Sequence, residues 1–362
     1  METVGVQLKE ETDNSYDILI DGGLFNNLAA ELKNKPLGNA YAIITDSNVG
    51  KIYGKKLVKN FQNKNLHAHL ITFPAGEKSK NRKIKEKIEN DMLKLAFGRD
   101  TCVIALGGGV AGDVAGFVAA TYMRGIPYIQ VPTSLLAMVD SSIGGKVGVD
   151  TEYAKNSIGA FYQPKKVIID LNFLKTLPKE ELANGLAEII KHALIKNKDF
   201  FHFLEKNIDD MLKLDFELLK KTIKKSCEIK ASVVMQDEKE KGMRRILNYG
   251  HTIGHAIESA LNYGISHGNA IAIGMSYAAK LSAKLGFLHE GSVIRQNNLL
   301  GHIGLPHRLS HHKLKPKKIL EYAQYDKKII NGRINFILLK SIGDAFISDK
   351  VTIDDIKKIM EE

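Results

Sequence analysis

A glycine-rich turn between an apolar strand and a helix constrains this sequence more than any other feature. Residues 101–106 read Thr-Cys-Val-Ile-Ala-Leu, and Gly107, Gly109 and Gly112 follow with the spacing G-x-G-x-x-G. Because glycines lack a Cβ atom, the backbone of such a turn can approach a pyrophosphate, whose charge faces the free N–H groups of the helix start. The order of strand, turn and helix therefore predicts dinucleotide binding, although the same glycines could serve only to pack helix against strand.

The acidic residue that usually follows such a turn at about 20 positions, and binds the ribose, is missing here. Two other segments offer polar groups directly after a strand-like run. Asp46 and Asn48 follow one such run, and Glu77 and Lys80 follow another. Both segments are candidates for contacting the cofactor, and either could also be ordinary loop or helix-cap chemistry.

Strands alternate with helices through the first half of the chain. Runs rich in β-branched residues occupy residues 16–20, 40–45, 67–73, 101–106, 128–131 and 166–169. Ile84, Ile88 and Met92 recur with helical spacing in one intervening segment, where Lys and Glu fill most other positions. This alternation is typical of a Rossmann-like α/β domain with a mostly parallel sheet.

Helical patterns dominate the second half. They cover residues 180–196, 200–212, 216–234, 250–261, 270–285 and 351–360, with one β-branched run at 335–339. The 362 residues therefore divide into an α/β dinucleotide-binding domain, residues 1–172, and a mainly α-helical domain, residues 173–362. Two such cores leave a crevice, where small molecules usually bind.

Composition excludes several other classes of protein. The net charge of +11 comes from lysines spread along the whole chain, which indicates a solvated surface and no nucleic-acid partner. No apolar stretch reaches the ~18–20 residues of a membrane span, and the first residues lack the pattern of a signal peptide. Cys102 and Cys227 lie far apart without a CxxC motif, which favours a reducing compartment, so we expect a cytoplasmic protein.

Histidines and a glutamate indicate a metal site in the second half. His251 and His255 are spaced i, i+4, so they share one face of a helix, and His267 follows closely. Glu188 on another predicted helix can supply a third ligand. Two imidazoles, a carboxylate and an open position make a catalytic zinc site, and spacing alone favours His251 with His255 as the histidine pair. The cations Lys230, Arg244 and Arg245 precede the cluster and suit an anionic substrate.

The motifs together resemble those of the sugar-phosphate cyclases and, within them, the 3-dehydroquinate synthase family. The matching segments begin with Ala105-Leu-Gly-Gly-Gly-Val-Ala-Gly-Asp-Val-Ala-Gly-Phe117, Tyr122-Met-Arg-Gly125, Val131-Pro-Thr-Ser134 and Val139-Asp-Ser-Ser-Ile-Gly-Gly-Lys146. They continue with Ala154-Lys-Asn-Ser-Ile-Gly-Ala-Phe-Tyr-Gln-Pro164, Leu247-Asn-Tyr-Gly-His-Thr-Ile-Gly-His-Ala256, His267-Gly and Asp326-Lys-Lys328. These segments span most of the chain in the order of the family.

The resemblance implies an NAD- and metal-dependent lyase of the shikimate pathway, which leads to chorismate and the aromatic amino acids. Its substrate is 3-deoxy-D-arabino-heptulosonate 7-phosphate, an anionic sugar phosphate. The ring hydroxyl at C5 is oxidised, phosphate is eliminated, the ketone is reduced, the ring opens, and an aldol closure gives 3-dehydroquinate. NAD is regenerated in each cycle, and the family acts as a homodimer in the cytoplasm.

The resemblance also assigns the site residues. It implies a metal ion, zinc or cobalt, bound by Glu188, His251 and His267, which revises the pair chosen from spacing and leaves His255 for hydrogen bonding and proton handling. The phosphate would be bound by Lys146, Asn156 and by Arg124 from a second subunit. The groups implied around the carboxylate and hydroxyls are Lys191, Lys230, Arg244, Asn248 and either Lys327 or Lys328, with Asp140 and Glu240 orienting substrate and lysines.

The NAD contacts implied by the resemblance come from many segments. They are Asp46, Asn48, Glu77, Lys80, Gly108, Gly109, Val110, Asp113, Thr133, Ser134, Lys146, Lys155, Phe173 and Thr176. The chain departs from the family pattern at Asn269, where Glu usually follows His-Gly, and at Ala154, where Gly is common. The first departure could alter the support of His267 but removes no ligand.

Three alternatives remain open from the sequence. A sister cyclase acting on glucose 6-phosphate or sedoheptulose 7-phosphate would share fold, NAD and metal. A metal-dependent polyol dehydrogenase would release NADH. A basic nucleic-acid-binding module would leave the glutamate and histidine set unexplained.

Overall fold

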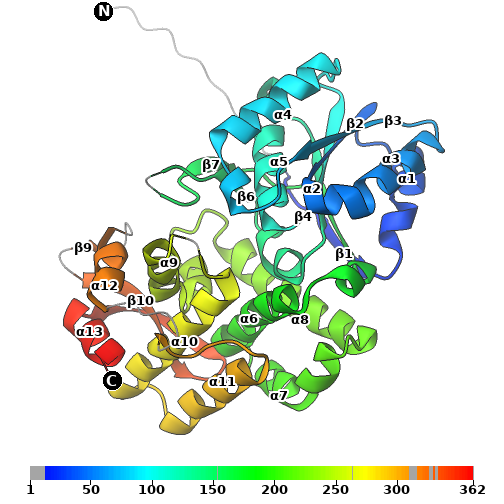
Figure 1. The fold of residues 1–362 in the computed structure, drawn as a ribbon. Coiled ribbons are helices and arrows are strands. Elements are labelled where there is room, and N and C mark those ends of the chain that lie inside the picture. Colours follow the sequence, from blue (N-terminus) through cyan, green and yellow to red (C-terminus); the bar gives the residue numbers. More distant parts are fainter. Residues whose placement is uncertain are drawn as a thin grey trace, which may run out of the picture.

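The computed structural model describes residues 13–152, 154–262, 264–309, 316–325, 329–330 and 333–361. A sheet flanked by helices forms one part of the molecule, and a group of helices with a small sheet forms the other (Figure 1). This arrangement confirms the predicted α/β domain followed by a mainly helical one.

A parallel six-stranded sheet with the order β1-β8-β5-β4-β2-β3 organises the first part. Its strands are β1 (Asp17–Asp21), β2 (Ala40–Asp46), β3 (His67–Phe73), β4 (Thr101–Gly107), β5 (Tyr128–Pro132) and β8 (Lys166–Asp170). All six predicted strands are present, each within one residue of its expected ends. The central strand β4 is buried along its whole length, which explains its uninterrupted apolar sequence.

Helices cover both faces of this sheet, joined by short helical turns. They are α1 (Leu24–Asn34), α2 (Ser47–Val49), η1 (Gly50–Gly54), α3 (Lys55–Gln62), η2 (Glu77–Ser79), α4 (Arg82–Lys94), α5 (Gly109–Thr121), η3 (Tyr122–Arg124), η4 (Ala137–Ser141) and η5 (Leu171–Thr176). An antiparallel hairpin of β6 (Lys146–Val149) and β7 (Ile158–Phe161) lies against α5. The sequence did not predict this hairpin, because its strands are only four residues long and rich in glycine.

The second part contains α6 (Lys179–Lys196), α7 (Lys198–Leu212), α8 (Phe216–Gln236), η6 (Met243–Asn248), α9 (His251–Ala260), α10 (His267–Lys284), α11 (Glu290–His302), α12 (Pro316–Tyr325) and α13 (Ile353–Glu361). A small antiparallel sheet joins β9 (Ile329–Ile330), β10 (Arg333–Ser341) and β11 (Asp344–Val351). The six predicted helices are confirmed, whereas α11, α12 and β11 were missed. The helix predicted from residue 351 begins at Ile353, because Val351 still pairs with Ile334 in the sheet.

A continuous apolar core connects the two parts. Leu135, Met138 and Val139, which follow strand β5, belong to the same buried cluster as helices α6 and α8. A second cluster fills the opposite face of the sheet, beneath α4 and α5. The division at residue 172 stays a prediction, since the chain passes from β8 to α6 there without a break in the core. Among the described residues, no helix combines the length and apolar character that crossing a membrane requires.

Candidate functional site

The glycine turn lies where three neighbouring parallel strands end. Gly107 closes β4 with a φ of 154°, and a Cβ atom there would lie 2.6 Å from the Cβ of Ala111. Asp46, at the end of β2, accepts hydrogen bonds from the backbone N–H of Asn48 (2.8 Å) and Val49 (3.1 Å). Thr133, just after β5, donates its backbone N–H to Gly107 O (2.9 Å). The carboxyl ends of the strands thus form one polar rim, the usual ligand-binding edge of such sheets.

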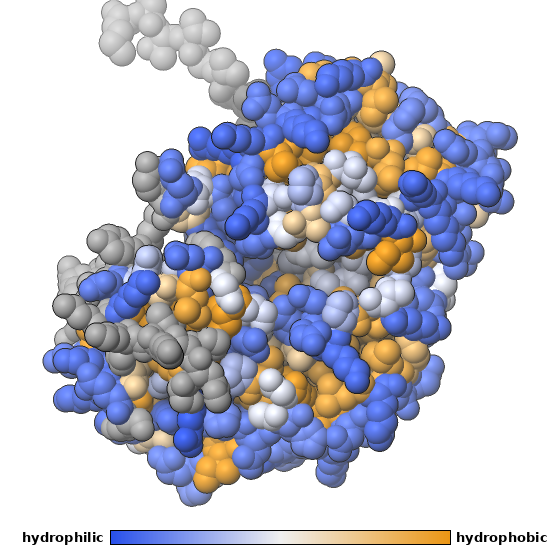
Figure 2. Space-filling model, viewed as in Figure 1, coloured by the Kyte–Doolittle hydropathy of each residue, from blue (hydrophilic) through white to orange (hydrophobic). Residues whose placement is uncertain are grey.

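A cavity of about 840 Å³ opens along this rim. Twelve of the fourteen predicted cofactor residues line it: Asp46, Asn48, Glu77, Lys80, Gly108, Gly109, Val110, Asp113, Thr133, Ser134, Lys155 and Thr176. The ring of Phe173 instead packs in the core against Phe25 and Tyr53, and Lys146 lies in a neighbouring cavity. The molecule is hollowed between its two parts (Figure 2).

Charged side chains across this cavity are already paired. Lys80 Nζ lies 2.5 Å from Asp113 Oδ2 and donates to Asn156 Oδ1 at 2.5 Å. Burial alone would lower the pKa of Lys80, but Asp113 and Glu77 raise it above the usual value. Lys155 Nζ lies 3.1 Å from Glu77 Oε1. These pairs fix polar groups in place before any ligand arrives.

Glycines bring three helices together behind the second candidate site. Gly250 adopts a φ of 78° immediately before α9, a backbone conformation that side chains rarely allow. A Cβ on Gly274 would lie 2.0 Å from Gly250 O, so only a glycine at this position allows α9 and α10 to cross so closely. A Cβ on Gly268 would lie 2.5 Å from Asn184 Oδ1 on α6, which instead accepts the Gly268 N–H. The start of α10 is therefore drawn onto α6.

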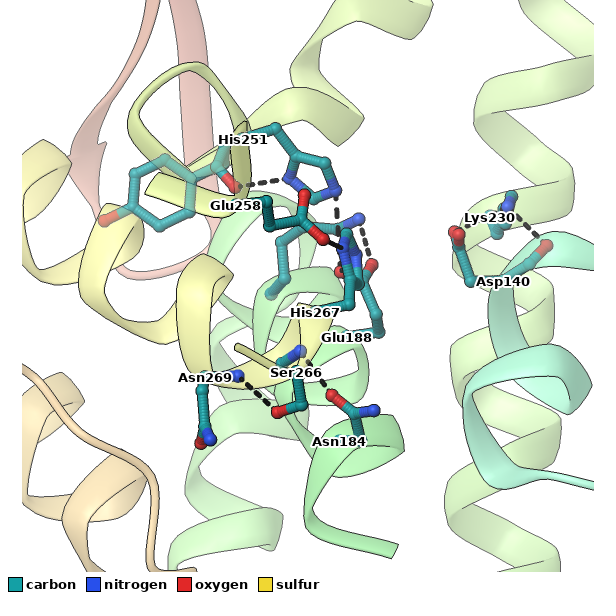
Figure 3. Close-up of polar contacts among 12 residues, drawn as sticks. Asp140, Asn184, Glu188, Lys230, His251, Glu258, Ser266, His267 and Asn269 are labelled. Atoms are coloured by element: carbon teal, nitrogen blue, oxygen red, sulfur yellow. Dashed lines mark hydrogen bonds and ion pairs between the residues drawn. The ribbon is translucent and has the colours of Figure 1, made fainter. Parts of the chain in front are cut away.

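The close approach unites Glu188, His251 and His267, whose ligand atoms lie within 4.8 Å of one another (Figure 3). Glu188 Oε1 is 3.6 Å from His251 Nε2 and 3.5 Å from His267 Nε2. A tetrahedral ion with bonds of ~2.1 Å needs ligand atoms ~3.4 Å apart, so the spacing fits. Glu188 is fully buried, and its Oε1 has no hydrogen-bond partner among the described residues. A bound metal ion would satisfy this oxygen.

The second ring nitrogens leave both Nε2 atoms for a metal. His251 Nδ1 lies 3.1 Å from Tyr249 O, and His267 Nδ1 lies 3.4 Å from Glu258 Oε1. Burial and the charge of Lys191 lower the pKa of His251 to about 3, so it is neutral. Burial would lower the pKa of His267 as well, but the nearby carboxylates of Glu188 and Glu258 raise it to about 9. A metal that binds here must therefore displace a proton from His267.

A second cavity of about 510 Å³ lies between the β6–β7 hairpin and the candidate metal triad, which consists of Glu188, His251 and His267. It is lined by nine of the eleven predicted catalytic residues: Asp140, Lys146, Asn156, Lys191, Lys230, Glu240, Arg244, Asn248 and His255. It shares Asp113, Asp140, Asn156, His255 and His267, among others, with the larger cavity, so the two cavities adjoin.

Carboxylates hold the cations of this cavity in position. Lys230 Nζ lies 2.5 Å from Asp140 Oδ1, although burial lowers the pKa of Lys230. Glu240 pairs with Lys146 and accepts a hydrogen bond from Asn248 Nδ2 at 2.8 Å. Burial would raise the pKa of Glu240, but the charge of Lys146 lowers it below the usual range.

One predicted catalytic residue among those that the structure describes lies outside both cavities. Arg124 is exposed in η3, with a φ of 69°, and lines neither of them. Lys327 and its alternative Lys328 lie outside the described residues.

The sequence analysis missed Glu258, which lies in α9 beside His255 and His267. Helical periodicity could have found it, since His251, His255 and Glu258 follow i, i+4, i+7 on one face. Asn269, the departure expected to affect His267, points away from it (Figure 3), and its backbone N–H donates to Ser266 Oγ at 3.4 Å.

Comparisons with known proteins agree with this geometry. The sequence profile "3-dehydroquinate synthase N-terminal" matches residues 70–184, and the profile "3-dehydroquinate synthase C-terminal" matches residues 185–329. The chain belongs to the 3-dehydroquinate synthase family. The family member from Dehalococcoides mccartyi strain CBDB1, named 3-dehydroquinate synthase, is 42% identical over 362 residues, which cover 100% of this chain and 99% of that protein.

Solved structures of relatives carry the expected ligands. The chain is similar to ValA, a 2-epi-5-epi-valiolone synthase from Streptomyces hygroscopicus subsp. jinggangensis 5008 with NAD+ and Zn2+ bound, with a TM-score of 0.90, 27% identity and 98% of each chain covered. It is also similar to a 2-deoxy-scyllo-inosose synthase complexed with carbaglucose-6-phosphate, NAD+ and Co2+, with a TM-score of 0.87, 30% identity, and 95% and 96% of the two chains covered. This chain therefore combines the family's fold with a candidate site of glutamate and histidine ligands.

Proposed function

We propose that this chain converts 3-deoxy-D-arabino-heptulosonate 7-phosphate to 3-dehydroquinate and inorganic phosphate. The observation that carries the proposal is that His255 and His267 line both cavities, in a chain of the 3-dehydroquinate synthase family. A cofactor at the strand ends and a substrate beside the metal triad would then meet where His267 lies.

NAD would occupy the larger cavity, and zinc or cobalt would be held by Glu188, His251 and His267. Bound together, they supply a reversible hydride acceptor and a charge that acidifies hydroxyls and polarises a ketone. The glycine turn and the N-terminus of α5 favour the pyrophosphate, while the paired nitrogens and the carboxylate favour a divalent ion. Residues 1–172 would provide most of the first site and residues 173–362 all of the second.

The substrate would bind through the cations of the smaller cavity. Lys146 and Asn156 lie at the hairpin side and suit the phosphate, whereas Lys230 and Arg244 on the helical side suit the carboxylate. Glu240 would orient Lys146, and Asp140 would orient Lys230, through the ion pairs that they form. Lys191 and Asn248 would contact the ring hydroxyls, and His255 would hold or deliver a proton at the reacting oxygen.

We further propose a cytoplasmic homodimer. Exposed Arg124, remote from the cavities of its own chain, would complete the phosphate site of the partner subunit. The two cysteines of the chain are free and buried, in keeping with a reducing compartment.

Phosphate release tests the reaction. The purified protein, given the heptulosonate phosphate and a trace of NAD, is expected to release one phosphate per substrate without accumulating NADH. Steady accumulation of NADH would instead identify a dehydrogenase.

A sister cyclase is the second candidate, because ValA and the 2-deoxy-scyllo-inosose synthase share the fold closely. The same assay with glucose 6-phosphate and sedoheptulose 7-phosphate separates the candidates. The cations opposite the hairpin favour the substrate with a carboxylate, so we expect release from the heptulosonate phosphate alone.

A further inference from the structure

The two histidine ligands of the triad differ in what holds their second ring nitrogen. His251 Nδ1 faces the neutral backbone oxygen of Tyr249, whereas His267 Nδ1 faces the carboxylate of Glu258 at 3.4 Å. Glu258 is 2% exposed, and its Oε2 has no hydrogen-bond partner among the described residues. Burying a charged carboxylate costs folding free energy unless other groups compensate its charge.

A cation from the other part of the molecule reaches Glu258 Oε1, the oxygen that faces His267. Lys155 Nζ lies 3.3 Å from Glu258 Oε1 and 3.1 Å from Glu77 Oε1. Lys155 belongs to the segment between β6 and β7, and Glu77 begins η2 after β3. Glu77, Lys155, Glu258 and His267 all line the larger cavity. A chain of contacts therefore runs from the cofactor side to a metal ligand.

We propose that Glu258 is a positioning residue that orients His267 and ties it, through Lys155, to the cofactor side of the site. The proposal rests on the proposed function, which assigns metal to the triad and NAD to the larger cavity. A carboxylate on Nδ1 fixes the ring's tautomer and orientation and makes Nε2 a better ligand. NAD that orders Lys155 would steady Glu258 in turn, so NAD and metal should each tighten the binding of the other.

The same atoms offer one competing interpretation. His255, Glu258 and His267 have ligand atoms within 4.8 Å of one another, so they could hold a second metal ion through His267 Nδ1. The ammonium of Lys155, 3.3 Å from Glu258 Oε1, opposes another cation beside that carboxylate. The geometry therefore favours the positioning role.

Metal affinity of the full-length protein tests the proposal directly. Co2+ is titrated into metal-free protein in competition with a chelator, with and without NAD, and its absorption spectrum is recorded. Glu258→Gln is expected to weaken Co2+ binding at least about tenfold and to alter the spectrum. NAD should tighten Co2+ binding about fivefold or more in the unchanged protein. Asn269→Ala, next to His267 in sequence but turned away from it, is the matched control and should leave affinity unchanged.

Lys155→Met provides an independent arm, in case Glu258→Gln folds poorly. At NAD concentrations that titration shows to saturate the variant, it should abolish the tightening of Co2+ binding that NAD causes in the unchanged protein. Unchanged affinity in Glu258→Gln, or full tightening in Lys155→Met, would overturn the proposal. So would two Co2+ ions per chain that fall to one in Glu258→Gln. Failure of the proposed function is distinguishable, because His251→Ala would then bind Co2+ as the unchanged protein does.

Discussion

The cofactor-side cavity and the metal triad are assembled in opposite ways. The first is lined by loops at the ends of parallel strands, where the backbone itself contributes, as in the turn from Gly107 to Gly109. The second depends on single side chains from three helices, α6, α9 and α10, held together by glycines at their crossings. A local motif can therefore specify the first site, whereas the second exists only once distant helices have packed.

This difference predicts that the two sites respond differently to the loss of a single side chain. Loss of one side chain should disable the metal site completely, because each ligand is a large share of the coordination. Loss of one lysine or asparagine from the cofactor cavity should be milder, because many backbone and side-chain groups share the binding.

The largest effect is expected for the proposed metal ligands. His251→Ala and His267→Ala should lose metal through desalting and lower kcat/KM on the order of 1000-fold, since a metal supplies several kcal/mol to such chemistry. Metal analysis and the phosphate-release assay measure both quantities. NAD affinity, measured without metal, should stay within about twofold in each variant.

His255→Ala serves as the matched control, because its ring lies beside the triad but outside the group that contains Glu188. It should keep its metal while losing activity. Metal loss in this variant would support the pair chosen from helical spacing, His251 with His255.

Arg124 comes next in expected size. Arg124→Ala should lower kcat/KM about 10- to 100-fold, because a charge-assisted hydrogen bond to phosphate is worth roughly 1.5–3 kcal/mol. Mixed with an equal amount of His267→Ala protein, it should regain about a quarter of the active sites, since half of the randomly formed dimers hold one complete site. Mixtures no more active than the separate variants would contradict a site shared between subunits.

The sequence predicted the two sites unequally, in keeping with their construction. Strand alternation and the glycine spacing located the cofactor-side rim, because both are local patterns with a period that a single segment displays. Spacing along one helix paired His251 with His255, and only the family resemblance replaced His255 with His267. No local pattern reports that Gly268 lies against Asn184, which is the contact that brings His267 to Glu188. Glu258 shares a helix face with His251 and His255, so its position could be predicted locally, but its partners Lys155 and His267 could not.

A pair of glycine variants tests whether the two sites can be disrupted separately. Gly268→Ala places a Cβ 2.5 Å from Asn184 Oδ1 and should push α10 from α6, with overpacking that costs about 1–3 kcal/mol of unfolding free energy. We expect weaker metal binding but unchanged NAD binding. Gly107→Ala places a Cβ 2.6 Å from the Cβ of Ala111. This variant should bind NAD more weakly and leave metal binding unchanged.

Each affinity is measured by titration in the absence of the other ligand, with thermal unfolding as the check on folding. Equal losses of affinity for both ligands in both variants would show that the two sites form one cooperative unit and are not assembled independently.

The smallest effect is expected for the dispersed surface lysines. Lys94 is 76% exposed and its Nζ lies 3.3 Å from Asp91 Oδ1, so Lys94→Ala should change the free energy of unfolding by less than about 0.5 kcal/mol and leave kcat/KM unchanged. Lys230→Met, by contrast, leaves half-buried Asp140 without its partner and should cost about 1–3 kcal/mol of unfolding free energy as well as activity. Denaturant unfolding and the phosphate-release assay compare the two. If Lys94→Ala impaired catalysis as much as Lys230→Met, the excess positive charge would act on the substrate as a whole-protein field, and the few cations of the smaller cavity would not account for anion binding.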